Sequence, residues 1–177
     1  MIAPPNASRG YTSKIVSTEE PHFTASLPRP RPPKEFRTSA SFLLKRMGFR
    51  LKERSLQAYE STGLSPYHHG VLALLDEEPV ETQSMIADAL GYDRSHLVGV
   101  LDDLEAQELI ERRRDPADRR RHLVTLTPAG KDAVTRLRAV SKQLDDEFFE
   151  PLSAEERHEL FVLLSRLARH HDPRFEE

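Results

Sequence analysis

The sequence contains no cysteine and no tryptophan, and only 7 of its 177 residues are glycine. Without cysteine there is no disulfide framework, no thiolate metal cluster, no cysteine nucleophile and no cysteine redox switch. Long apolar runs are missing too. None approaches the roughly 20 residues of a membrane-spanning helix, and the N-terminal MIAPPNASRGYTSK lacks the hydrophobic core of a signal peptide. We therefore expect a soluble, cytoplasmic protein with no membrane partner.

Charge is unevenly distributed along the chain. Charged residues make up 31% and apolar residues 37% of the sequence, a polar composition that still allows a core. The formal net charge is −3, yet residues 1–37 carry six Lys and Arg against three acidic residues. Because charges act over about 8 Å at physiological salt, a local basic cluster can attract nucleic acid although the whole chain is acidic.

Residues 1–37 are predicted to form a tail. They hold seven of the thirteen prolines, and Pro28-Arg29-Pro30-Arg31-Pro32-Pro33 cannot continue a helix or a sheet ladder. Two interpretations stay open. The tail is mobile or lies over the body of the protein, or it is an arm that adds dimer contacts or touches DNA phosphates through Arg29, Arg31 and Lys34.

Two regions, residues 38–64 and 127–177, are predicted to contain dimerisation helices. In the first, apolar residues recur every seven positions in two stripes that lie roughly 200° apart around a helix. A helix that is apolar on opposite sides has to be covered from both, which favours a homodimer. The stripes are Phe42, Phe49 and Leu56, and Leu44, Leu51 and Ala58; in the second region Val134, Leu137, Leu144 and Phe148 have a coiled-coil-like spacing before a last helix that opens with a capping box at Ser153.

Residues 65–126 have the pattern of a winged helix-turn-helix. Thr82 caps a short helix over 83–90 that ends at Gly91, and Asp93 caps a second helix that begins at Arg94. Two strand-like segments then flank a turn at 115–118 and form a basic hairpin. The predicted fold class is mainly α with a small β-hairpin wing, a winged helix-turn-helix with flanking dimerisation helices.

Four segments within residues 38–170 resemble the MarR family of bacterial and archaeal transcription regulators. The resemblance implies a sequence-specific DNA-binding regulator of transcription, a ligand-released homodimeric repressor on a pseudo-palindromic operator. The sequence alone does not distinguish repression from activation. The segments are Gly63-Leu64-Ser65-Pro66, Thr82-Gln83-Ser84-Met85-Ile86-Ala87, Leu101-Asp102-Asp103-Leu104-Glu105 and, most specific, DPADRRRHLVTLTPAG over residues 115–130.

The hairpin carries six arginines between Arg112 and Arg121 against three acidic residues, a local excess of three positive charges. Arginine at a hairpin tip suits a narrow groove lined by phosphates. The resemblance implies that Arg120 enters the minor groove and that Asp118, two residues earlier, orients its guanidinium by paired hydrogen bonds. Arg119 and Arg121 are then expected to contact phosphates. The alternative is a solvated hairpin whose arginines only keep the protein soluble.

The second helix of the motif is the predicted recognition helix. Its first turn has free backbone N–H groups and the positive end of the helix dipole, which favour phosphates and base edges. Arg94 is expected to bind a guanine, and His96 or Val98 a base edge or a thymine methyl group. Asp102 and Asp103 add negative charge, and the family often has a basic residue where Gly99 stands. The predicted contacts are Arg94, Ser95, His96, Val98 and Gly99 in this helix, with Thr82, Gln83 and Ser84 at phosphates; Thr82 has the alternative role of a cap.

The resemblance also implies a small aromatic or anionic effector in a crevice between the dimer helices and the DNA-binding lobe. Adjacent histidines on a helix point about 100° apart, so at most one of them faces a given pocket. Ordinary core or surface positions are the alternative. The residues proposed for this site are Arg46, Arg50, Tyr59, Tyr67, His68 and His69. No two histidines are spaced three or four apart, so neither a metal site nor a cofactor is predicted.

Two other classes of function stay open. A winged helix that binds a protein instead of DNA is favoured by the acidic Asp102, Asp103 and Glu105. An enzyme is disfavoured because the sequence has no Gly-rich phosphate loop and no local Ser/His/Asp motif.

Overall fold

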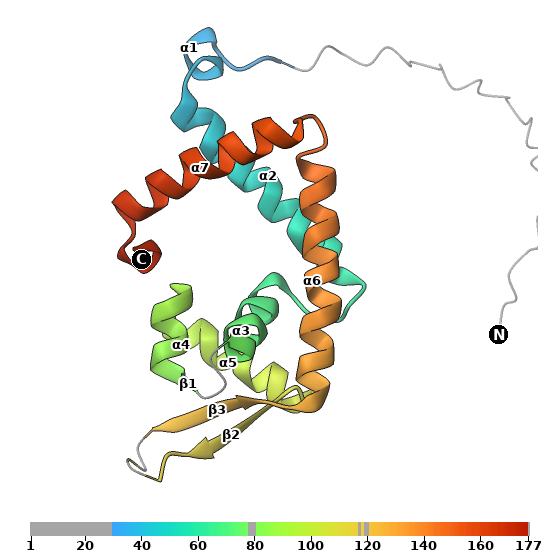
Figure 1. Cartoon of the computed structure of the whole chain (residues 1–177), viewed down its shortest axis with the longest axis vertical. Coiled ribbons are helices and arrows are strands. Elements are labelled where there is room, and N and C mark those ends of the chain that lie inside the picture. The colour runs from blue at the N-terminus through green and yellow to red at the C-terminus, as the bar shows by residue number, and fades with distance from the viewer. Residues whose placement is uncertain (1–29, 78–80, 117, 119–120, 177) are drawn as a thin grey trace, which may run out of the picture.

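The computed structural model describes residues 30–77, 81–116, 118 and 121–176 (Figure 1). It confirms the predicted fold class: a mainly helical chain with a hairpin wing. The prediction for residues 1–29 and the predicted contacts at Arg119 and Arg120 lie outside the described residues. The elements are α1 (Lys34–Arg37), α2 (Ala40–Glu60), α3 (Pro66–Glu77), β1 (Glu81–Thr82), α4 (Gln83–Leu90), α5 (Arg94–Ala106), β2 (Ile110–Arg114), β3 (His122–Leu126), α6 (Pro128–Phe148), α7 (Ala154–His171) and the 3-10 helix η1 (Pro173–Phe175).

The helix starts follow from short polar side chains that accept backbone N–H groups. Thr82 accepts from the N–H of Met85 at the start of α4, and Thr127 accepts from the N–H of Gly130 at the start of α6. Ser153 forms the predicted capping box of α7. Gly91 ends α4 with φ 66°, a left-handed conformation that favours glycine, and so lets α5 begin three residues later.

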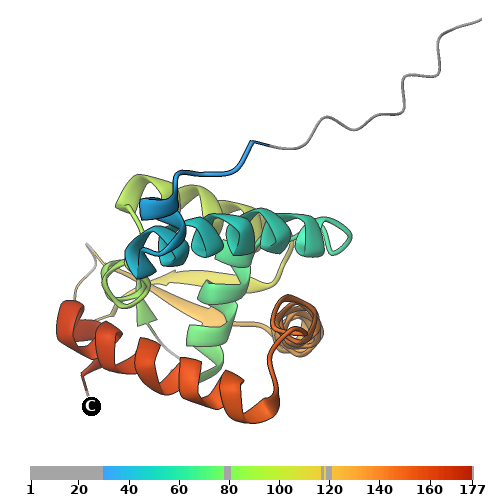
Figure 2. The same ribbon diagram turned by 90° about the horizontal axis from the view of Figure 1, so that it is seen from above.

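α3, α4, α5 and the sheet form one lobe, and α6 runs from that lobe to the region of α2 and α7 (Figure 1). α2 and α7 cross in the projection of Figure 1, but Figure 2 shows that they lie along opposite sides of the molecule. Among the described helices, none is long and apolar enough to cross a membrane.

The sheet has a third strand that the sequence pattern did not predict. β1 pairs with β3 through Glu81 and Val124, and β3 pairs with β2 through Leu126 and Ile110, in the order β1-β3-β2. Two residues are too few to show an alternating pattern. This short strand attaches the start of α4 to the wing.

The core of the lobe is assembled from α3, α4, α5, β3 and α6. Val134 and Leu137 of α6 are 0% and 1% exposed, and Leu144 is 8% exposed. Val134 and Leu137 therefore belong to the core of their own chain, and their spacing does not by itself indicate a second subunit. The largest fully buried side chains are Leu72, Leu75, Ile86, Leu101, Leu104, Ile110, Leu137, Val71, Val124 and Val134.

The last four residues of the predicted N-terminal tail belong to the described structure. Residues 34–37 form the one-turn helix α1, and the ring of Phe36 stacks on that of Phe42 in α2 with centroids 5.2 Å apart. Apolar contact between the two rings holds α1 on α2. The helix α1, which begins at Lys34, lies at the end of the molecule opposite the wing (Figure 1).

Candidate DNA-binding interface

A groove of about 250 Å³ lies between the start of α4, the exposed side of α5 and the base of the wing. It brings together predicted contacts from three separate elements, and Arg94 and Arg121 give it positive charge from two sides. Leu97 and Leu101 form its apolar floor. The lining residues are Thr82, Gln83, Ser84, Arg94, Leu97, Val98, Leu101, Arg121 and His122.

Thr82 has a structural role within this groove. It is 4% exposed, and its hydroxyl accepts the N–H of Met85 as the cap of α4. Gln83 is half-buried and Ser84 is exposed. Of the three phosphate contacts predicted near this helix start, we therefore keep only Gln83 and Ser84 as proposals.

Two of the backbone N–H groups that were expected to be free in the first turn of α5 already donate to Asp93. The carboxylate of Asp93 accepts the N–H of Ser95 at 2.9 Å and that of His96 at 3.3 Å, and it also accepts the hydroxyl of Ser95. The hydrogen bond from Ser95 and those from the two amides hold the pKa of Asp93 below its ordinary value. An anion at this helix start would meet a carboxylate, so the charge that Arg94 supplies becomes more important.

His96 is turned towards α3. Its ring meets that of Tyr67 edge-to-face with centroids 4.7 Å apart, and that of Tyr92 at 6.1 Å. Its base contact stays a prediction, but the groove is lined by Arg94 and Val98 from this part of the helix instead. Gly99 is exposed, and a Cβ added there would meet nothing within 4 Å. Position 99 therefore has room for a longer side chain on the exposed side of α5.

Sequence analysis missed the role of Arg112. Its Nη2 lies 2.7 Å from Asp102 Oδ1 and 2.5 Å from Glu105 Oε2, and its Nε donates to the same Glu105 oxygen at 3.0 Å. The hydrogen bonds from Arg112 lower the pKa of Glu105. Arg112 therefore joins β2 to the recognition helix and neutralises two of the acids that had counted against DNA binding. One sequence signal could have found this role. Asp102 and Glu105 lie near the end of a predicted helix, and Arg112 follows seven residues after Glu105.

Replacement of Arg112 by alanine is expected to lower both stability and DNA affinity. Asp102 and Glu105 would be left as unpaired negative charges on the recognition helix, at a cost of about 1–2 kcal/mol after allowance for their exposure. Thermal unfolding and duplex titration at low salt measure the two effects. Arg113→Ala is the matched control, because it removes the same charge from a side chain that is 76% exposed and pairs with Glu111 on its own strand. Equal losses of DNA affinity in both variants would mean that Arg112 contributes only its positive charge and not its pairing with Asp102 and Glu105.

The described part of the wing tip is closed by backbone hydrogen bonds. The N–H of Asp115 donates to Arg121 O at 3.0 Å, and the N–H of Arg121 donates to Asp118 O at 2.9 Å. Nε of Arg121 lies 3.9 Å from Oδ2 of Asp115. Asp118 is half-buried, and its predicted relation to Arg120 stays a prediction because Arg120 is outside the described residues.

The six residues predicted for an effector site do not meet in one place. His69 Nδ1 and the hydroxyl of Tyr59 are 2.6 Å apart and close a contact between α3 and α2. Burial lowers the pKa of His69 and raises that of Tyr59. His68 contacts Ser65 at the start of its own helix. Arg50 pairs with Glu53 at 2.9 Å, and Arg46 is exposed. Tyr59 and the two histidines thus have structural contacts.

A cleft between α2 and the start of α3 does exist, with a volume of about 190 Å³. Tyr67 is its one lining residue from the predicted set, and the other five predicted residues lie outside its lining. Lys52 supplies a cation and Tyr92 a second ring. The lining residues are Lys52, Ser55, Leu56, Pro66, Tyr67 and Tyr92. Within the described residues no group of three or more His, Asp or Glu could hold a metal ion.

Comparisons with known proteins agree on one family. A family model described as MarR family matches residues 62–121. A putative transcriptional regulatory protein for the hcr operon of Thauera aromatica is 34% identical over 131 residues, which cover 70% of this chain and 79% of that protein. The transcriptional repressor CouR, solved bound to a 23-mer DNA duplex, is 32% identical with a TM-score of 0.72, over 78% of this chain and 99% of CouR. BpsR of Bordetella bronchiseptica, whose DNA binding is regulated by 6-hydroxynicotinic acid, is 29% identical with a TM-score of 0.66, over 72% of this chain and 97% of BpsR.

Proposed function

We propose that this chain, which belongs to the MarR family of transcriptional regulators, is a homodimeric repressor that binds a pseudo-palindromic operator and is released by a small ligand. The chain is a transcriptional regulator and not an enzyme. The observation that carries the proposal is the groove between α4, α5 and the wing, in a chain that is 32% identical to a repressor solved on a DNA duplex. We also propose that the protein is located in the cytoplasm, because a regulator of this kind acts on the chromosome.

In the proposed complex α5 lies in the major groove and the wing reaches the adjacent minor groove. Arg94 and Val98 contact base edges from α5, while Gln83, Ser84 and Arg121 contact phosphates. Ser95, His96 and Gly99 stay proposed contacts, although other features of the structure engage or limit them. The first two contact Asp93 and Tyr67, respectively, and Gly99 has no side chain.

Selection of bound duplexes from a random pool tests this function. Enrichment of an inverted repeat is the expected result, and half-sites read by two recognition helices should be about 34–36 Å apart. A salt series on the selected duplex should give a steep fall of log affinity with log salt, because bound phosphates release counterions. Failure to enrich any duplex would favour a winged helix that binds a protein. The acids that pointed to that alternative are largely accounted for, since Asp102 and Glu105 pair with Arg112.

The proposal of a homodimer rests on apolar surface that the single chain leaves exposed. α7 contains no buried residue, and Phe161 on it is 66% exposed. On α2, Phe49 is 57% exposed. Burial of such side chains contributes roughly 1.5–3 kcal/mol each, so a second copy that covers both helices would be strongly favoured. The exposed apolar residues of the two helices are Leu43, Leu44, Met47, Phe49 and Leu56, and Phe161, Val162, Leu163, Leu164 and Leu167.

We place the ligand in the cleft between α2 and α3 and propose an aromatic carboxylate. Lys52 would bind the carboxylate, and the rings of Tyr67 and Tyr92 would contact the aromatic part. These two rings are in edge contact with each other and with His96 in the first turn of α5. A ligand that moves them therefore moves the start of the recognition helix, which gives a physical route to release from DNA.

Lys52→Gln is expected to weaken binding of benzoate-like compounds about tenfold, because a charge-assisted hydrogen bond contributes roughly 1.5 kcal/mol or more. Thermal-shift titration measures the binding, and operator competition measures the coupling. Lys45→Gln, which removes the same charge from α2 outside the cleft, is the control. Hits that stabilise the protein without changing its DNA affinity, or that bind Lys52→Gln as well as the wild type, would place the effector elsewhere.

A further inference from the structure

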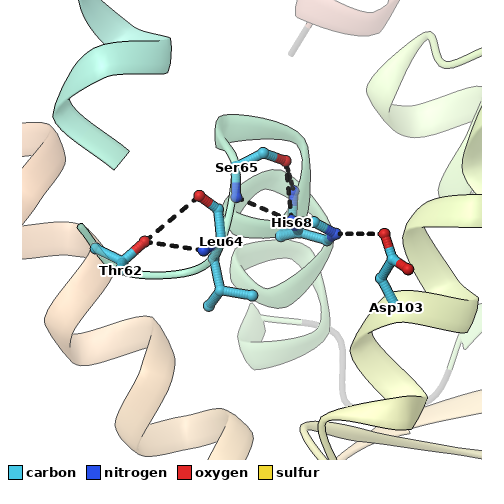
Figure 3. A network of polar contacts seen from close by, with 5 residues as sticks. All are labelled: Thr62, Leu64, Ser65, His68 and Asp103. Carbon is cyan, nitrogen blue, oxygen red and sulfur yellow. Dashed lines mark hydrogen bonds and ion pairs between the residues drawn. The ribbon is translucent and has the colours of Figure 1, made fainter. Parts of the chain in front are cut away.

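The start of α3 carries a capping box in which histidine takes the position usually held by Glu or Gln (Figure 3). The backbone N–H of Ser65 donates to Nδ1 of His68 at 2.9 Å, and the backbone N–H of His68 donates to Oγ of Ser65 at 3.3 Å. The hydroxyl of Ser65 also lies 2.9 Å from Nδ1. Both residues therefore hold the first turn of α3.

This arrangement defines the protonation state of the ring. Since Nδ1 accepts a backbone N–H, it has to carry a free lone pair, and the proton of the neutral ring is then on Nε2. Nε2 is buried and has no hydrogen-bond partner among the described residues. It faces Oδ2 of Asp103, on the recognition helix α5, at 3.6 Å (Figure 3). One histidine thus stands between the start of α3 and the helix proposed to read DNA.

We propose that His68 is a positioning residue for DNA recognition: its neutral ring caps α3, and protonation transfers it from Ser65 to Asp103, so that acid lowers DNA affinity. This inference rests on the proposed function. An imidazolium has two donors and no acceptor, so a proton on Nδ1 would oppose the N–H of Ser65. The charged ring instead favours the carboxylate of Asp103, and α5 and the start of α3 would change their relative position.

The charged groups around His68 come from α5. Burial lowers the pKa of His68; the negative charge of Asp103, whose Oδ2 lies 3.6 Å from Nε2, opposes this, and the charge of His96 adds to it. On its own helix, His69 contacts Tyr59 instead. Because the pKa is depressed in the folded protein, the cap contributes fully above the ordinary histidine pKa of about 6.5 and is lost as the pH falls below that value through the folded pKa.

The consequence reaches the cleft between α2 and α3. Pro66 and Tyr67, which line that cleft, lie between Ser65 and His68 in the sequence. A change in the capping box therefore displaces two walls of the cleft together with its contact to α5.

The test compares the wild type with His68→Gln. Glutamine is a natural partner in a capping box and does not titrate, so the variant should fold and keep its DNA affinity at pH 7.5. Between pH 7.5 and 5.5 the wild type is expected to lose about fivefold more affinity for a selected duplex than the variant, the equivalent of a helix cap of about 1 kcal/mol. His96 and His122 are present in both proteins, so their effects cancel in the ratio.

Equal pH dependence of DNA affinity in the two proteins would overturn the inference. Absence of duplex binding by both at every pH would instead reject the proposed function, and the two failures are therefore distinct. Asp103→Asn supplies a second measurement that does not depend on the glutamine variant. Loss of the carboxylate should move the midpoint of the acid-induced affinity loss to lower pH, and an NMR titration of the His68 ring should shift in the same direction. An unchanged midpoint would exclude transfer to Asp103.

Discussion

Replacement of Phe161 and Leu164 on α7 by glutamate is expected to produce a monomer with at least about 100-fold lower affinity for a two-half-site operator. The two side chains lie on one side of α7 and are 66% and 37% exposed in the single chain. If a second copy covers them, two buried carboxylates would prevent association. Loss of the dimer removes the effective concentration that links two half-site interactions, an effect of about 10²–10⁴.

Sedimentation at micromolar concentration measures the oligomeric state, and duplex titration measures the affinity. Because both residues are exposed in the single chain, the helix content and the affinity for an isolated half-site should be unchanged. Arg136→Glu on α6 is the matched control, since it also changes the net charge by two at an exposed position outside α2 and α7. A wild-type monomer, or a double variant that stays dimeric, would contradict the proposed interface.

Arg120→Ala is expected to weaken operator binding more than tenfold, and Asp118→Ala nearly as much, although the second substitution removes a negative charge. Charge counting alone predicts that loss of Asp118 strengthens DNA binding. If Asp118 orients the guanidinium of Arg120, the side chain of Arg120 becomes disordered in the free Asp118→Ala variant. Ordering it on binding to DNA then costs about 1 kcal/mol of binding free energy. The double variant should then bind like Arg120→Ala alone.

Titration of one duplex at several salt concentrations separates these outcomes. Loss of a phosphate contact alone reduces the salt slope by about one unit, whereas a lost minor-groove contact also changes the preference for the operator over random duplex. Asp115→Ala is the control, because it also removes a carboxylate from the wing. The Asp115 carboxylate lies beside Arg121. Tighter binding by Asp118→Ala would refute the orienting role.

Local patterns predicted most of the fold. Thr82, Asp93 and Ser153 were identified as caps from their side chains and the apolar spacing that follows them, and each accepts a backbone N–H at a helix start. Such signals operate within one turn of a helix, so the sequence contains all the information they need. The hairpin was equally local. The strand β1 was missed because its two residues are defined only by pairing with β3.

The site was less predictable, because its contacts join residues that are distant in the sequence. The groove combines α4, α5 and the wing as expected, but Arg112 was counted as one positive charge among six and in fact pairs with two acids of α5. His69 was assigned to a ligand and contacts Tyr59. In both cases the side chain could reach several partners, and packing selected one.

The sequence by itself determined the order of the elements, their caps and the basic character of the wing, because these depend on side chains that are near one another along the chain. Only the tertiary structure decided which charges are neutralised, which apolar faces stay exposed and which ring carries the contact to Asp103. Val134 and Leu137 illustrate the difference: their spacing showed an apolar face, but the packing of α6 against its own lobe determined what covers it. Burial and pairing depend on three-dimensional neighbours, and the same periodicity satisfies a core and an interface alike.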